Sequence, residues 1–446
     1  TLNATRRQRQ MCIRDRDKLF RSGVNTWKSP RIVPSMKTRF VLLLLSTVFT
    51  ILSGCRDIQS TPALTKFTVL YTNDEHGWIS GVDEDKGAAN LAGLWEEGGY
   101  YEDERVLILS GGDNWTGPAV STWHKGQSTV EVMNAMGYDA AAVGNHEFDF
   151  GLNALEDRIA QAEYPFLSAN IRYRSTGQAP LDLGILPYKI IQIDNLNIAV
   201  IGLTTIQTPS ITNPQFVADF EFLPYREALE ELIPRVRQDG AEVVIVIGHI
   251  CSDDLTRLAW QLKSQGIAFM GGGHCHEEFA RRVAGTILMS AGSRLEGYGL
   301  ARFEYDPKTD QVLAAGYANH RNSNNRPNLE IAAIVSRWEA KTDAELGVMI
   351  GYLEDELPRR SPLLESLITN AWLEGFPDAE VAITNRGGIR EGLPSGEITL
   401  AHIISTLPFN DTLVAVRMNG DQLLHILERS KSPAVGGVRL SDSGWI

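Results

Sequence analysis

The sequence predicts an α/β fold with at least two folded units. Its 446 residues are about three times the length of a ~150-residue domain. From residue 67 onward, short apolar runs typical of buried strands alternate with segments of helical periodicity. The apolar runs end in polar, glycine-rich turns, which is where an α/β domain carries its functional residues.

Composition and charge narrow the class of protein. Apolar residues make up 43% of the chain, with 40 Gly and 19 Pro, a globular composition without low-complexity bias. Acidic residues outnumber basic ones by 55 to 42, and the formal net charge is −13. This charge argues against a broad basic surface, so we expect no nucleic-acid partner, and no obligate protein partner is predicted. An anionic substrate must then be bound by a local group of positive charges.

The first 35 residues differ from the rest of the chain in charge. They hold nine Arg or Lys against two Asp, without hydrophobic periodicity. We expect residues 1–35 to be a non-native or disordered extension, with Met36 as the true start. A basic arm for nucleic acid or membrane is the alternative interpretation.

Residues 36–55 have the pattern of a lipoprotein-type signal peptide. Lys37 and Arg39 precede an apolar run at residues 40–52, which is shorter than the ~20 residues that span a bilayer. Small residues then precede Cys55 in the sequence Leu-Ser-Gly-Cys. The pattern predicts a membrane partner through a lipid anchor on Cys55, and an extracytoplasmic location in the periplasm or cell envelope. An ordinary signal peptide or a short signal anchor is the alternative.

The first large unit, residues 66–320, is predicted from alternating strands and helices. Buried strands are expected at residues 67–71, 106–109, 140–143, 243–247 and 267–270. Helices are expected between them at residues 129–136, 152–162, 226–238 and 255–265. Residues 189–194 and 197–203 read as a hairpin, which makes the sheet mixed.

A connector and a smaller unit follow. The polar stretch 319–328 lacks periodicity, and residues 329–346 read as a helix, so we assign residues 321–347 to a linker and connector helix. Strand and helix signals resume in residues 348–446, which we expect to form a second α/β unit that is incomplete at its end.

Five of the nine histidines lie in turns directly after predicted strands, together with acidic and amide side chains. The segments are Asn73-Asp74-Glu75-His76, Gly112-Asp113-Asn114, Gly144-Asn145-His146-Glu147-Phe148-Asp149, Gly248-His249 and Gly273-His274-Cys275-His276. Taken singly they have ordinary explanations, such as a surface turn for Asp74 or a hydrogen-bonded core histidine for His249. Together they predict a site for Zn²⁺, Mn²⁺ or Fe, which favour imidazole, carboxylate and amide oxygen ligands.

Three segments resemble one known family. They are Gly144-Asn145-His146-Glu147-Phe148-Asp149, Asn385-Arg386-Gly387-Gly388-Ile389-Arg390 and Leu407-Pro408-Phe409-Asn410. In these segments the chain resembles the bacterial 5′-nucleotidase and UDP-sugar hydrolase family of the calcineurin-like metallophosphoesterases. The resemblance implies a four-layer α/β/β/α metallophosphoesterase domain, followed by a smaller α/β 5′-nucleotidase C-terminal domain that determines substrate specificity.

The same resemblance implies a set of site residues and two divalent metal ions, Zn, Mn or similar. One ion would be held by Asp74, His76, Asp113 and His276, and the other by Asp113, Asn145, His249 and His274. A bridging carboxylate keeps two ions about 3.5 to 4 Å apart. The implied catalytic residues are His146, as a donor to the phosphoryl or leaving oxygen, and Asp149, which orients its ring. The implied substrate contacts are Asn145, Arg360, Asn385, Arg390 and Phe409, the last by stacking on the base.

Two cysteines flank the predicted ligands. We interpret Cys251 and Cys275 as structural, because alternation along extended segments points them away from the metal ligands. Whether they pair is left open by the sequence, since two cysteines do not make a disulfide framework.

The activity that the resemblance implies is hydrolysis of nucleoside 5′-monophosphates to nucleoside and phosphate, in extracytoplasmic nucleotide salvage. UDP-sugars and nucleoside diphosphates are expected as further substrates. One alternative is a 2′,3′-cyclic-nucleotide 2′-phosphodiesterase with 3′-nucleotidase activity. Another is a non-catalytic surface module that binds nucleotides.

Overall fold

The computed structural model describes residues 64–83, 85–323, 326–430, 433–438, 440–441 and 444–445. The predicted extension of residues 1–35, the predicted signal peptide of residues 36–55 and its Cys55 lie outside the described residues. The described residues belong to one compact unit, Leu64–Ile446. Within them, none of the helices combines the length and apolar character that a bilayer crossing requires.

Two six-stranded sheets form the centre of the first part of the chain. In spatial order, the first sheet consists of β14 (Gln311–Arg321), β13 (Gly297–Asp306), β1 (Thr65–Thr72), β2 (Val106–Ser110), β3 (Ala140–Ala142) and β4 (Phe166–Leu167). The second consists of β11 (Glu278–Val283), β12 (Thr286–Ala291), β10 (Ile267–Gly271), β9 (Val243–Gly248), β7 (Leu196–Leu203) and β6 (Tyr188–Ile193).

Both sheets are mixed, as the sequence predicts. Strands β1 to β4 run parallel in the first sheet, and so do β7, β9, β10 and β12 in the second. The outer strands β13, β14, β6 and β11 pair antiparallel. The predicted hairpin is β6–β7, whose closing pair is Ile193 and Leu196. The functional consequence is that all the central strands present their carboxyl ends at one edge of their sheet.

The core explains why these strands read as uninterrupted apolar runs. In β9, Val243 and Ile245 face the other sheet, whereas Val244 and Val246 face the helices. In β1, Val69 packs between the sheets and Leu70 packs against the helices on the other side. Strands covered on both faces carry apolar residues at every position instead of alternating ones.

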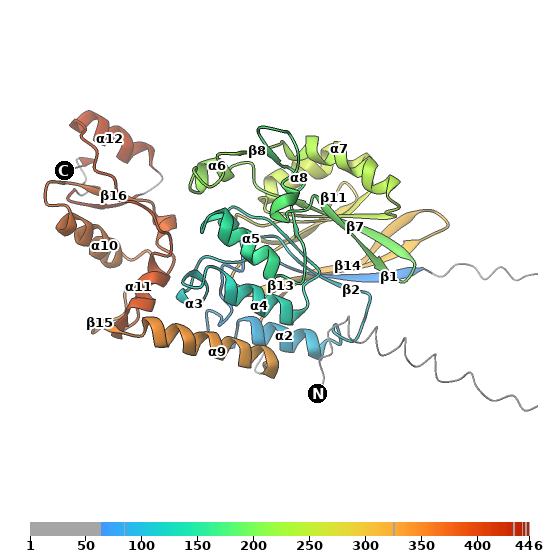
Figure 1. Cartoon of the computed structure of the whole chain (residues 1–446), viewed down its shortest axis with the longest axis horizontal. Helices are drawn as coiled ribbons and strands as arrows, with labels where there is room; N and C mark the ends of the chain where they lie inside the picture. The colour runs from blue at the N-terminus through green and yellow to red at the C-terminus, as the bar shows by residue number, and fades with distance from the viewer. Residues whose placement is uncertain are drawn as a thin grey trace, which may run out of the picture. The chain divides into compact units, whose positions relative to one another are not determined.

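Helices cover the outer face of each sheet, which gives the predicted four-layer α/β/β/α architecture (Figure 1). On the first sheet they are α2 (Ala88–Glu97), α4 (Gln127–Met136), α5 (Leu152–Gln161) and α9 (Leu329–Leu346). On the second they are α7 (Tyr225–Gln238) and α8 (Ser252–Gln261). The shorter elements are α3 (Ala119–Thr122), α6 (Thr208–Ile211), η1 (His146–Phe148), η2 (Leu181–Leu183), η3 (Lys263–Gln265), β5 (Ile171–Tyr173) and β8 (Phe220–Phe222).

One predicted helix differs in its bounds. The helix expected at residues 255–265 begins earlier, at Ser252, because Cys251 has the extended backbone of an N-cap. Two aspartates in the first turn then face the positive end of the helix dipole. The helix ends at Gln261, and η3 takes up the remaining residues before Gly266, which has a left-handed φ of 66°.

The last part of the chain is a smaller mixed α/β arrangement. Its elements are β15 (Met349–Leu353), α10 (Pro362–Gly375), β16 (Ala382–Thr384), η4 (Arg386–Gly388), β17 (Gly396–Thr399), α11 (Leu400–Thr406), α12 (Gly420–Arg429), β18 (Ala434–Gly436), β19 (Leu440–Ser441) and β20 (Gly444–Trp445). The strands pair as β15–β17, β16–β18 and β19–β20, all antiparallel. A separate small core forms around Leu364, Ile389 and Ile398. By contrast, α9 packs into the core of the first part through Val335 and Trp338.

Candidate metal centre and active site

The candidate metal ligands lie in turns at the carboxyl ends of parallel strands from both sheets. β1 is followed by Asp74 and His76, β2 by Asp113, β3 by Asn145, β9 by His249, and β10 by His274 and His276. Residues up to 200 positions apart in the sequence, such as His76 and His276, therefore come into direct contact.

Five of these residues have a left-handed backbone, with φ of 53° at Asp74, 46° at His76, 57° at Asp113, 73° at His274 and 54° at His276. L residues avoid this region because Cβ approaches the following carbonyl oxygen, at a cost of roughly 1–2 kcal/mol each. Such strain persists where the surrounding structure fixes it, and it clusters at functional sites. Gly144 supplies the space beside Asp113, since a Cβ at residue 144 would lie 2.1 Å from Oδ1 of that carboxylate.

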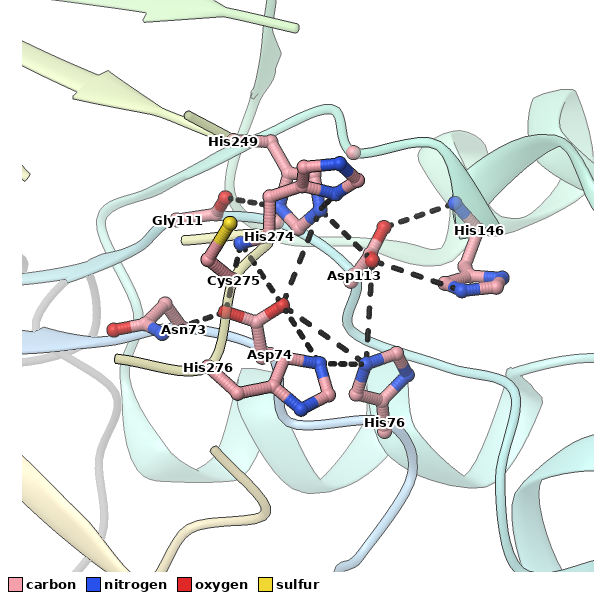
Figure 2. Close-up of polar contacts among 12 residues, drawn as sticks. Asn73, Asp74, His76, Gly111, Asp113, His146, His249, His274, Cys275 and His276 are labelled. Carbon is pink, nitrogen blue, oxygen red and sulfur yellow. Dashed lines mark hydrogen bonds and ion pairs between the residues drawn. The ribbon is translucent and has the colours of Figure 1, made fainter. Parts of the chain in front are cut away.

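The side chains point toward one another (Figure 2). Nε2 of His249 lies 2.8 Å from Oδ2 of Asp113 and 3.2 Å from Nδ1 of His274. Nε2 of His276 lies 3.0 Å from Nε2 of His76 and 3.4 Å from Oδ1 of Asp74. The residues form overlapping groups that can hold a metal ion, namely Asp74, His76 and His276; Asp113, His249 and His274; and His76, Asp113 and His146.

Three observations fit a metal ion at this position. Nδ1 of His76 lies 3.1 Å from the carbonyl oxygen of Thr116, and Nδ1 of His249 lies 3.1 Å from that of Gly111. A carbonyl that accepts from one ring nitrogen fixes the tautomer and leaves the other nitrogen free to bind metal. The buried Oδ1 of Asn145 has no hydrogen-bond partner, as a ligand oxygen would in the absence of its cation.

The electrostatics of the site also favour a cation. Burial, together with the charge of Asp113 and against the opposing effect of His249, raises the pKa of Asp74 to about 7. Burial alone would raise the pKa of Asp113 as well, but the charges of His249 and His146 hold it well below its usual range. Burial lowers the pKa of His274 to about 4 and that of His276 to about 3. These two rings are therefore neutral at pH 7 and offer lone pairs.

His146 is placed beside the ligands and is oriented by Asp149. Nδ1 of His146 lies 2.6 Å from Oδ2 of Asp149, and its backbone N–H donates to Oδ1 of Asp113. Burial lowers the pKa of His146, but the charges of Asp149 and Asp113 outweigh burial and raise it overall. Asp149 is not the N-cap of α5, since that position is Gly151. The pair is built to keep a proton on the imidazole.

Two buried glutamates, Glu75 and Glu147, support the ligand turns and were not singled out from the sequence. The carboxylate of Glu147 accepts backbone N–H bonds from Asp113, Asn114 and Gly144. Glu75 accepts from the hydroxyl of Ser110 and the amide of Asn114. Burial raises the pKa of both, that of Glu147 to about 8. Their only sequence signal is that Glu75 adjoins the candidate ligand His76 and Glu147 adjoins the candidate catalytic residue His146.

The predicted substrate residues fall into two groups. Nη2 of Arg390 lies 3.1 Å from Nε2 of His76, and the ring of Phe409 stacks on His146 with centroids 5.3 Å apart. Arg390 also lies over the face of Phe409, at 5.7 Å. By contrast, Asn385 uses its side chain to accept from the backbone of Gly388, and Arg360 is exposed.

Two arginines that the sequence analysis did not name lie near Arg390. Nη2 of Arg294 lies 3.5 Å from the carbonyl oxygen of Arg390, and its guanidinium covers the ring of Trp78 at 4.7 Å. Nε of Arg359 donates to the carbonyl of Ile389 at 2.9 Å. Burial and the charges of Arg294 and Arg390 together lower the pKa of Arg359 to about 10. Arg294, Arg359 and Arg390 together form the local group of positive charges that an acidic chain needs to bind an anion.

The two cysteines left open by the sequence are joined. Cys251 and Cys275 form a disulfide, so they are structural and are not free thiols in this structure.

The four-layer fold carries candidate histidine and carboxylate ligands at its strand ends, an arrangement that suits a metal-dependent phosphoesterase. Comparison with known proteins shows the family to which the chain is similar. Residues 350–443 match the model of the 5'-nucleotidase C-terminal domain. Protein UshA of Escherichia coli K12 is 28% identical over 454 residues, which cover 87% of this chain and 80% of UshA. The venom 5'-nucleotidase of Gloydius brevicauda is 27% identical, with 90% of this chain and 75% of the relative covered.

Solved structures share the fold. The 5'-nucleotidase precursor of Thermus thermophilus has a TM-score of 0.72 at 21% identity, with 86% of this chain and 87% of that one covered. The NAD nucleotidase of Haemophilus influenzae has a TM-score of 0.60 at 17% identity, with 86% and 84% covered. The predicted resemblance is confirmed, because the chain is a homologue of the 5'-nucleotidases and of UshA and carries the C-terminal domain of that family.

Proposed function

We propose that this protein is a two-metal phosphohydrolase that converts nucleoside 5′-monophosphates to nucleoside and phosphate. The observation that carries the proposal is the stacking of Phe409 on His146 with Arg390 against His76. A base-stacking ring and a phosphate-binding cation thus stand directly beside the candidate ligands. UDP-sugars and nucleoside diphosphates are proposed as further substrates, since homology extends to UshA.

The proposed ligand assignment follows the contacts. Asp74, His76 and His276 would hold one ion, His249 and His274 would hold the other, and Asp113 lies between the two groups. Asn145, whose buried Oδ1 has no hydrogen-bond partner, is assigned to the second ion by the resemblance. When bound, two such ions polarise the phosphoryl group and lower the pKa of a water molecule.

The side chains of the chain supply the remaining steps. Arg390 pairs with the anionic phosphoryl oxygens, and Phe409 holds the base by its π-face, which tolerates different bases. His146 holds its proton toward the phosphoryl or leaving oxygen, and Asp149 keeps the ring charged and oriented. In the overall reaction the phosphorus–oxygen ester bond breaks, water supplies the new oxygen on phosphorus, and its proton ends on the nucleoside hydroxyl. Arg360 and Asn385 are proposed to contact the substrate at the outer side of this site.

The proposal includes the domain assignment and the location of the protein. Residues 66–320 are assigned to the catalytic domain, 321–347 to the linker and connector helix, and 348–446 to the specificity domain. The Leu-Ser-Gly-Cys sequence before residue 56 supports a lipid anchor on Cys55 and an extracytoplasmic site of action. Mass spectrometry of the membrane fraction tests the anchor, and a Cys55 peptide without added lipid mass contradicts it.

The activity test measures phosphate release after chelation and after readdition of Mn²⁺ or Zn²⁺, with AMP, UDP-glucose and 2′,3′-cyclic AMP side by side. Metal-dependent release from AMP is expected. Asp113→Asn abolishes it, whereas Asp194→Asn is the matched control. Both aspartates have a left-handed backbone, at φ of 57° and 52°, but Asp194 lies in the exposed β6–β7 turn.

Other outcomes of this test identify the alternatives. Release from cyclic AMP alone would identify the cyclic-nucleotide phosphodiesterase. Metal binding without release from any of the three substrates would contradict the proposed activity and leave a non-catalytic nucleotide-binding module as the alternative.

A further inference from the structure

The Cys251–Cys275 disulfide joins the two turns that carry three of the candidate metal ligands. Cys251 lies two residues after His249 and is the N-cap of α8. Cys275 lies between His274 and His276 (Figure 2). The bond therefore closes a loop of 24 positions that contains α8 and β10. Candidate ligands lie next to both ends of this loop.

The turn that carries His274 and His276 is the more exposed of the two, although the backbone N–H of His274 donates to the carboxylate of Asp74. His249 is fully buried, whereas the side chain of His276 is 33% exposed and Cys275 is an exposed residue. Both His274 and His276 have left-handed φ values, of 73° and 54°, which an L residue does not hold without external support. The side chains of these residues therefore depend on what fixes the turn between them.

Hydrogen bonds also hold the two turns together, on both sides of the histidine pair. The backbone N–H of Gly273 donates to the carbonyl of Ile250 at 3.0 Å, and the N–H of Ser252 donates to the carboxylate of Glu277 at 2.9 Å. These bonds lie before and after the histidine pair in the second turn. The disulfide is the covalent connection at the middle of that turn, at the residue between the two ligands.

We propose that the disulfide is a positioning element for the metal site, which holds His274 and His276 against His249 and Asp74 before the metal binds. Pre-organised ligands lose less conformational freedom on binding, so the metal binds more tightly. This inference rests on the metal site proposed above. It assigns Cys251 and Cys275 a role in metal affinity beyond their contribution to stability.

The test compares the chain with its Cys251→Ser/Cys275→Ser variant. Affinities for Mn²⁺ and Zn²⁺ are measured by competition with a chelator, and thermal unfolding is measured on the metal-free proteins. We expect the variant to fold and to bind metal at least about tenfold more weakly, the usual scale for residues that orient ligands. Leu229→Ala in the core of α7 is the control for stability, because it lowers the unfolding temperature far from the ligands and leaves metal affinity unchanged.

Equal metal affinity in the chain and the double variant, with only the unfolding temperature lowered, would overturn the inference and leave the proposed function intact. A chain that binds no metal at all would overturn the metal site and this inference together.

A second measurement, made on the unmodified chain, tests the inference if the double variant does not fold. The disulfide of the unmodified chain is reduced with a phosphine, which becomes its oxide with oxygen from water while the sulfur–sulfur bond takes up two electrons and two protons to give two thiols. Metal affinity is then measured on the folded protein before reduction, after reduction and after reoxidation. A reversible loss of affinity supports the inference, and the same affinity in all three states overturns it.

Discussion

At the scale of single residues, the site contains left-handed backbone conformations and buried charges, both of which cost free energy. Left-handed φ values at Asp74, Asp113 and His274 are tolerated because glycines and buried carboxylates surround them. Glu147 illustrates this support, since it accepts three backbone N–H groups from the turns that present Asp113 and Asn145. The free energy that these conformations and charges cost is offset elsewhere in the fold, where the two sheets and the helices that cover them bury apolar side chains.

His146→Ala is expected to retain metal and lose turnover by a hundredfold or more, the scale on which a positioned donor acts. The reason is that the backbone N–H of His146, which alanine keeps, donates to Oδ1 of Asp113, whereas the ring, whose Nε2 lies 3.9 Å from Oδ2 of Asp113, is proposed to act on the phosphoryl group and not to bind metal. Steady-state kinetics and metal analysis check this, with the exposed His425→Ala on α12 as the control. Loss of metal content in His146→Ala would show that His146 is a ligand instead.

Glu391 gives a prediction for stability against pH. Burial raises the pKa of its carboxyl to about 7, against the opposing charges of Arg294 and Arg359, and its Oε1 is buried without a hydrogen-bond partner. The unfolded chain ionises this group near its ordinary value of 4.5. Between these pH values only the folded protein holds the proton, so the contribution of Glu391 to stability falls as pH rises and is lowest above pH 7.

Glu391→Gln removes this ionisation, so the variant is expected to gain stability relative to the unmodified chain at pH 8 but not at pH 5. Thermal unfolding at both pH values checks it. The exposed Glu374→Gln on α10 serves as the control. Its unfolding temperature is expected to differ from that of the unmodified chain by the same amount at each pH. A difference for Glu391→Gln that does not change with pH would contradict the raised pKa.

At the scale of elements, the long helix α9 depends on its first turn for its placement. The side chain of Asn328 accepts from the backbone N–H groups of Glu330 and Ile331, both at 3.1 Å, and its own N–H donates to Ala89 of α2. Trp338 then carries the helix into the core and donates to Glu131 of α4. The N-cap therefore fixes where α9 begins against α2.

Asn328→Ala is expected to destabilise the protein by about 1 kcal/mol, because two backbone donors of α9 lose their acceptor. Asn328→Ser keeps a capping oxygen and is expected to lose only a small part of this stability. Unfolding in denaturant measures both. If the serine variant were as unstable as the alanine variant, the contribution of Asn328 would lie in its contact with Glu96 and not in the cap.

The central strands of the two sheets and several helices could be predicted from the sequence because their signals are local. The bounds expected for the strand at 243–247 and the helix at 329–346 agree with β9 and α9 to within one residue. The start of α8 was misplaced, since its cap is Cys251, a residue with no capping side chain in this structure. Arg294 was missed because nothing local marks it, and only the fold brings it beside Arg390.

At the scale of the whole molecule, the metal site and the fold are expected to stabilise each other. Asp74 and Asp113 are buried with several histidines around them, and a cation there binds the folded state alone. Metal at a thousand times its dissociation constant contributes about 4 kcal/mol by mass action. Chelation is therefore expected to lower the unfolding temperature by several degrees, and readdition of Mn²⁺ or Zn²⁺ to restore it.

Calorimetry with and without chelator checks this linkage, with metal content measured on the same samples. Asp113→Asn is expected to show no response, because the shared carboxylate is gone. An unfolding temperature that chelation does not change would mean that the site holds no metal in the folded protein.

The sequence by itself determined the fold class, the central strands of the two sheets with several of the helices, and the candidate metal ligands. These follow from periodicity and from motifs that occupy a few adjacent positions, such as Gly144 to Asp149. Only the tertiary structure decided which of these residues meet, that Cys251 and Cys275 pair, and that Glu75, Glu147, Arg294 and Arg359 support or surround the site. The physical reason is that a contact between residues hundreds of positions apart is set by how two sheets pack, and no local pattern records it.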